Sequence, residues 1–95
     1  MTHHYKTQVA DDVIRDGLGI ELLNEEGDVV AEVFRSDRAH TVLVNTFSYD
    51  IPLEAIDLLI SRAKEVLDPF ENGVPLSNAI LVAPKLVRRP ASDGA

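Results

Sequence analysis

The strongest periodic signal in the chain is the sequence PLEAIDLLISRAKEVL, which occupies residues 52–67. At about 100 degrees per residue, its apolar side chains fill one broad arc, and most of its polar and charged side chains fill the opposite arc. The apolar arc consists of Leu53, Ala55, Ile56, Leu59, Ile60, Ala63, Val66 and Leu67. Pro52 suits the first turn of a helix, and Asp68 before Pro69 ends it. The pattern predicts one amphipathic helix that packs on another layer.

Three stretches upstream of this helix alternate or are rich in β-formers: residues 18–23, 29–34 and 40–49. Residues 24–28, between the first two, form a turn signal in which Gly27 can take a positive φ. A polar link, residues 35–38, precedes the third stretch. We therefore predict an α+β fold, in which a three-stranded antiparallel sheet (β-β-β-α) is packed by one amphipathic helix.

The predicted strands carry apolar side chains on both of their faces. In residues 40–49, Val42 and Val44 fall on one face while Leu43 and Phe47 fall on the other. A sheet with one solvated face normally alternates more cleanly between apolar and polar residues. We expect something to cover the second face.

The two ends of the chain leave alternatives open. Residues 1–16 form an N-terminal arm or short element, which either pairs as an edge strand through Tyr5, Thr7 and Val9 or forms a short helix over residues 8–15. Residues 17–70 are the predicted core domain. Residues 71–95 are an extended segment punctuated by prolines. Its apolar run, residues 79–83, is either a fourth strand on this sheet or an addition to the edge or groove of another subunit.

Charge narrows the class of partner. The net charge is −7, and residues 1–84 hold six Lys and Arg against fifteen Asp and Glu, whereas residues 85–95 hold three against one. Binding to DNA or RNA depends on cationic side chains at the phosphates, so we expect no nucleic-acid partner. The basic residues Lys85, Arg88 and Arg89 either contact an acidic patch or end a strand and aid solubility.

The amino-acid composition indicates the cellular compartment in which the protein is expected. The chain has no cysteine, which excludes a disulfide framework and fits a reducing compartment. Its N-terminus lacks the apolar run of a signal peptide, and no stretch approaches the length of a membrane span. We expect a cytoplasmic protein without a membrane partner.

The sequence offers no set of residues that carries a reaction. His3 and His4 are adjacent, but a metal site needs three or four converging ligands. His40 reads as a surface residue, and the Gly17-Leu18-Gly19 stretch precedes a strand, unlike a dinucleotide-binding loop. The acidic residues around Gly27 lack the spacing of a calcium loop. We expect no catalytic residue, no metal and no cofactor, and hence no enzyme.

The remaining expectation is a non-enzymatic protein–protein interaction or regulatory module, with a homodimer as the favoured assembly and another protein as the alternative partner. The apolar residues least easily covered by one helix, and so the predicted interface, are Val30, Phe34, Ile80, Leu81 and Val82. The alternative function is a small-molecule binding protein or enzyme accessory. Its pocket would lie between sheet and helix and be lined by Phe34, Phe47, Tyr49 and Ile56.

Overall fold

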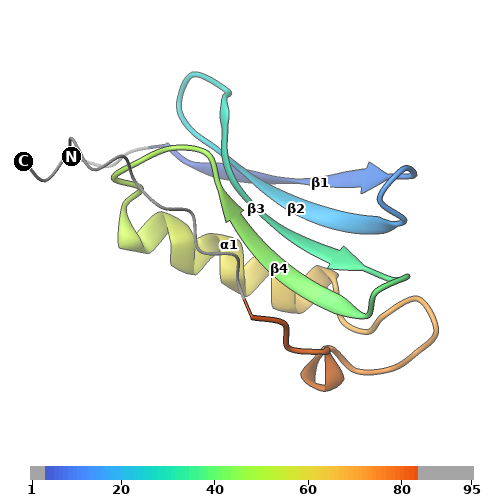
Figure 1. The fold of residues 1–95 in the computed structure, drawn as a ribbon. Coiled ribbons are helices and arrows are strands. Elements are labelled where there is room, and N and C mark those ends of the chain that lie inside the picture. The colour runs from blue at the N-terminus through green and yellow to red at the C-terminus, as the bar shows by residue number, and fades with distance from the viewer. Residues whose placement is uncertain (1–3, 84–95) are drawn as a thin grey trace, which may run out of the picture.

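The computed structural model describes residues 4–83 of the chain. They form a four-stranded antiparallel sheet in which every strand pairs with its neighbour in sequence, in the order β1-β2-β3-β4. The strands are β1 (Lys6–Asp12), β2 (Gly17–Leu23), β3 (Val29–Ser36) and β4 (Thr41–Thr46). One helix, α1 (Leu53–Val66), lies along one face of this sheet (Figure 1). The α+β class and the antiparallel sheet are as predicted.

The structure has four strands where the sequence predicts three, and the additional strand lies at the N-terminus. The arm pairs as an edge strand, with Thr7 opposite Leu22 and Val9 opposite Ile20. The alternative helix over residues 8–15 is wrong, because β2 offers the arm a full row of backbone partners. A tight turn follows at residues 13–16, where the Arg15 N–H donates to Asp12 Oδ1 (2.9 Å).

The fourth strand predicted from the C-terminal run is also wrong within the described residues. A 3-10 helix, Leu76–Asn78, precedes the run, and residues 79–83 have no regular secondary structure. Within residues 4–83, one backbone hydrogen bond attaches the run to the sheet region: the Ile80 N–H donates to the His40 carbonyl (2.8 Å). The prolines on both sides, Pro75 and Pro84, limit the length over which a ladder could form.

The predicted hairpin between β2 and β3 is confirmed, together with the role of its glycine. Gly27 has a φ of 88°, a conformation that costs other residues energy. Asn24 closes the turn, since its Oδ1 accepts hydrogen bonds from the backbone of Glu26 (3.0 Å) and Asp28 (2.9 Å).

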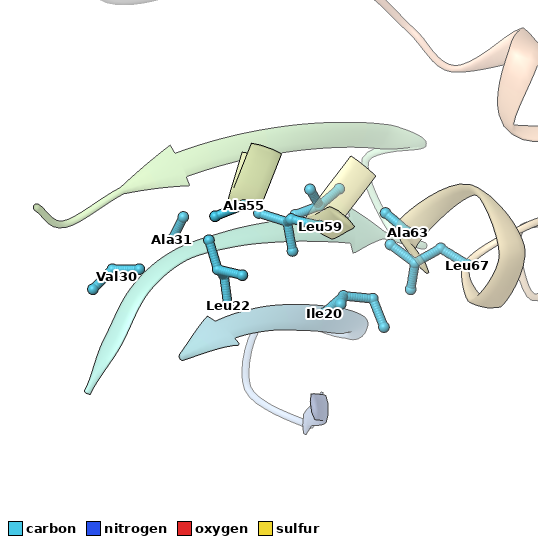
Figure 2. Packing of buried hydrophobic residues seen from close by; sticks show 9 residues of the cluster. Ile20, Leu22, Val30, Ala31, Ala55, Leu59, Ala63 and Leu67 are labelled. Carbon is cyan, nitrogen blue, oxygen red and sulfur yellow. The ribbon is translucent and has the colours of Figure 1, made fainter. Parts of the chain in front are cut away.

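The hydrophobic core lies between α1 and the central strands, and Figure 2 shows the side chains that meet there. Leu59 and Leu67 at the helix are fully buried, as are Leu22 and Ala31 of the sheet. Burial of one such leucine stabilises the fold by about 1.5–3 kcal/mol. The core consists of Ile20, Leu22, Val30, Ala31, Val33, Ala55, Leu59, Ala63 and Leu67.

The helix does not cover the sheet evenly. It packs chiefly on β2 and also on β3 and β1, so the helix-side face of β4 is left partly open. Leu53 and Ile60, which the periodicity places in the apolar arc, are accordingly exposed. They share a side of α1 with Lys64, which lines an open hollow beside Val42. The part of the sheet that α1 covers least is therefore β4.

Candidate interaction surface

The strand β4 is an edge without charge. Among the described residues it pairs with β3 alone, and Thr41–Thr46 contains no Asp, Glu, Lys or Arg. The opposite edge, β1, carries Lys6, Asp11 and Asp12. Charged side chains are a common protection of a sheet edge against pairing with another chain. One edge of this sheet is thus protected by charge, and no further strand from residues 4–83 pairs with the other.

Apolar side chains are exposed on both faces of β4. Val44 lies on the helix side, opposite Val33, and its exposed fraction is 56%. Leu43 lies on the opposite face and is also exposed. The uncharged edge therefore has an apolar side chain available on each face.

The exposed apolar surface continues into the loop between β4 and α1. Phe47 is 60% exposed and Tyr49 is 83% exposed, and Leu53 follows at the start of the helix. The loop is attached to the sheet, since the Phe47 N–H donates to the Val30 carbonyl (2.8 Å). Thr46, Phe47, Ser48 and Tyr49 line an open hollow of about 250 Å³.

This surface lies in a part of the sequence whose charged residues are all acidic. Residues 39–61 contain Asp50, Glu54 and Asp57 and no Lys or Arg. All three carboxylates are exposed. Glu54 also suits its place in the first turn of α1, where the helix dipole favours a negative charge. The loop therefore presents two aromatic rings in an acidic setting.

Part of the face of the sheet away from α1 is covered by Arg15, in the turn between β1 and β2. The Arg15 guanidinium lies 3.9 Å from the centre of the Phe34 ring and donates to both Glu32 oxygens (2.9 and 3.2 Å). Asn45 of β4 donates to the same carboxylate (2.9 Å). Arg15 also pairs with Asp12. Arg15 thus covers the part of this face around Phe34 and Glu32, while Leu43 on the same face stays exposed.

The hydrogen bonds of this cluster fix its charge states. Those from Arg15, and then from Asn45, hold the pKa of Glu32 below its usual value against the opposing effect of burial. The backbone and guanidinium of Arg15 likewise lower the pKa of Asp12. The two carboxylates raise the pKa of Arg15. The hydrogen bonds therefore favour the charged forms of Asp12, Arg15 and Glu32.

The five residues predicted as an interface divide into two groups. Val30 and Phe34 are buried within the chain: Val30 belongs to the core, and Phe34 lies beneath Arg15. The expectation that Phe34 was uncovered did not allow for the turn that folds back over the sheet, and Val30 is buried by the core itself. Ile80, Leu81 and Val82 are exposed.

The four residues predicted to line a pocket between sheet and helix do not come together. Phe34 lies on the face away from α1, since its neighbour Val33 faces the helix core. Phe47 and Tyr49 are in the exposed loop, and Ile56 packs against the core.

Histidines and carboxylates do not form a metal centre in residues 4–83, where no three such groups converge. His40 stacks on Phe70, with ring centroids 4.7 Å apart, and its Nε2 lies 3.2 Å from Asn72 Nδ2. His4 is exposed, and His3 lies outside the described residues. No helix of the described part has the length and apolar character needed to cross a membrane.

A second, acidic hollow is lined by carboxylates of β1, the following turn and the loop after β3. Two of its carboxylates form ion pairs: Asp37 pairs with Arg35 (3.1 Å), and Asp12 pairs with Arg15. Arg35 also donates to the carbonyls of Leu67 and Pro69 (3.0 Å each), beyond the C-terminal end of α1. This region ties the helix to the sheet.

No family model matches the sequence, and neither the curated proteins nor the solved structures contain a match to it. The candidate surface therefore rests on the geometry of the chain itself. Sequence reasoning did not single out Val44, Phe47, Tyr49 and Leu53 as a surface. The signal that could have found them is the uncharged run of residues 39–49.

Proposed function

We propose that this protein is a non-enzymatic interaction module that assembles with a second copy of itself through the edge of β4. The observation that carries the proposal is the contrast between the two edges of the sheet. β1 has charged residues that oppose further pairing, whereas Thr41–Thr46 is uncharged and leaves Leu43 and Val44 exposed.

An edge that pairs with its own copy forms an isologous interface across a two-fold axis. Antiparallel pairing of β4 with β4 satisfies the outer backbone groups of both strands and continues the sheet across the dimer. Charge repulsion at the contact itself is small, because neither copy brings a charged side chain in Thr41–Thr46. Val44 would then meet apolar side chains of the second copy on the side that α1 leaves open.

The decisive experiment compares Val44→Asp with Val9→Asp in the full chain. The two valines match closely: each lies on an edge strand, on the helix side, with 56% and 52% of the side chain exposed. We expect sedimentation velocity and native mass spectrometry to show a dimer for the parent and for Val9→Asp. Val44→Asp should be chiefly monomeric, because the dimer would bury two carboxylates without partners.

Circular dichroism checks that both variants retain the fold. A parent chain that stays monomeric at high concentration contradicts the proposal, as does a dimer that Val44→Asp leaves intact. A monomer carrying a small added mass in native mass spectrometry would instead favour the small-molecule alternative.

A further inference from the structure

The loop between β4 and α1 has properties that pairing through β4 does not require. It begins beyond the last residue of β4, and its two aromatic side chains are more exposed than Val44. Large exposed aromatic side chains are frequent anchors in protein–protein interfaces. The rings border an open hollow of about 250 Å³ that also involves Thr46 and Ser48.

We propose that this loop binds an extended peptide segment with basic and apolar residues, and that Phe47 and Tyr49 hold one of its Lys or Arg side chains. We define this surface, the aromatic loop, as residues 47–50 with Leu53. A cation over an aromatic face is attracted by the ring's quadrupole. Asp50, next to Tyr49, supplies an opposite charge, and Leu53 offers a contact for an apolar neighbour in the peptide.

Charge complementarity selects this occupant. Three exposed carboxylates, those of Asp50, Glu54 and Asp57, lie in residues 39–61, where no Lys or Arg offsets them. Residues 1–84 as a whole are also acidic, with six Lys and Arg against fifteen Asp and Glu. An acidic peptide, a nucleic acid or an anionic membrane would be repelled by this surface. A basic segment is attracted to it.

The surface is prepared in part before the peptide binds. The hydrogen bond from the Phe47 N–H to the Val30 carbonyl fixes the start of the loop on β3, and Leu53 opens the helix at its other end. A loop held at both ends loses less conformational entropy on binding than a free one.

The test uses two synthetic peptides of equal length, one alternating lysine with leucine and one alternating glutamate with leucine. Fluorescence anisotropy measures their binding to the full chain at low salt. We expect the lysine peptide to bind and the glutamate peptide not to bind. The double variant Phe47→Ala with Tyr49→Ala should weaken binding of the lysine peptide about tenfold or more, the usual effect of losing interface anchors.

Ile14→Ala is the matched control, because Ile14 is 90% exposed on the turn between β1 and β2, away from the aromatic loop. It should leave the affinity unchanged. Asp50→Asn should also weaken binding without altering the sedimentation of the protein, which separates this surface from the dimer contact. If the dimer proposal failed, the peptide result would still stand by itself.

Three outcomes would overturn the proposal. The first is equal binding of both peptides, and the second is an affinity that the double variant leaves unchanged. The third is binding that appears only after Lys85, Arg88 and Arg89 are all changed to Ser. Those residues lie outside the described part, and that result would identify the chain's own basic end, instead of a partner, as the occupant.

Discussion

Glu32 is buried, although a glutamate side chain is normally exposed to solvent. It is a buried carboxylate in the middle of a sheet, held by Arg15 and Asn45. In the sequence it is the polar residue within the otherwise apolar stretch of residues 29–34. Its partner Arg15 could not have been predicted, because the contact exists only once the turn at residues 13–16 folds back over β3.

This arrangement predicts acid sensitivity. The pKa of Glu32 is lower in the folded protein than its usual value, chiefly through Arg15, although Asp12 nearby opposes this. The unfolded chain therefore binds a proton more readily, so the stabilisation is present above the usual pKa and is lost as pH falls through the folded value. Glu32→Gln should lower the free energy of unfolding by about 1–2 kcal/mol at neutral pH.

Urea unfolding of the parent and Glu32→Gln at neutral pH and near pH 3 measures this effect. The difference between the two should shrink at the lower pH, where Glu32 of the parent is closer to neutral. Glu25→Gln, in the exposed turn between β2 and β3, is the control and should track the parent at both values. A difference that is the same at both values would show that the charge of Glu32 does not stabilise the fold.

Among the elements, β2 and β3 show how glycine permits the cover of the second face. A Cβ added at Gly17 would lie 2.0 Å from the Arg35 carbonyl oxygen and 2.5 Å from Cζ of Phe34. The ring of Phe34 lies against β2 in this space, beneath Arg15. The sequence analysis placed this glycine stretch before a strand and so missed that role, since β2 begins at Gly17.

Gly17→Ala should therefore lower the free energy of unfolding by about 1–3 kcal/mol, the usual cost of overpacking. Gly19→Ala is a matched control on the same strand, where the nearest atom, Cδ1 of Phe34, would lie 3.4 Å away. Urea denaturation should show a much smaller loss for Gly19→Ala. Equal losses at the two positions would contradict the packing described for Phe34.

The elements themselves were predictable to different degrees. The helix, the hairpin and strands β2 and β3 follow from local patterns in residues 18–67, and the structure agrees with them. For the N-terminal arm, the local sequence allowed either an edge strand or a short helix. The pairing with β2, a contact distant in sequence, shows that the strand is correct. The apolar run 79–83 resembles a strand in sequence, but the 3-10 helix before it and its proline neighbours leave it only one hydrogen bond to the sheet region.

At the scale of the whole molecule, the two proposed contacts respond to salt in opposite directions. The dimer brings together two acidic bodies through an uncharged strand, so screening of their mutual repulsion should tighten it. The aromatic loop attracts a basic peptide by opposite charge, so screening should weaken that binding.

Sedimentation velocity and peptide anisotropy, each measured from about 0.05 to 0.5 M NaCl, test this prediction. The dissociation constant of the dimer should fall as salt rises, while that of the lysine peptide should rise. Val9→Asp, which adds a charge far from β4, serves as a control for the first series and should show the same trend as the parent. Parallel trends in the two series would mean that one of the contacts is wrongly assigned.

The order of the strands also bears on how quickly the chain reaches its fold. Every strand pairs with the one before it through a short connection, so no part of the sheet must wait for distant segments to meet. The conformational search is therefore largely local, and closure of short loops costs little entropy. A sheet of this order is expected to form faster than Greek-key or parallel arrangements of similar size, and its open edge is exposed to other chains for less time during synthesis.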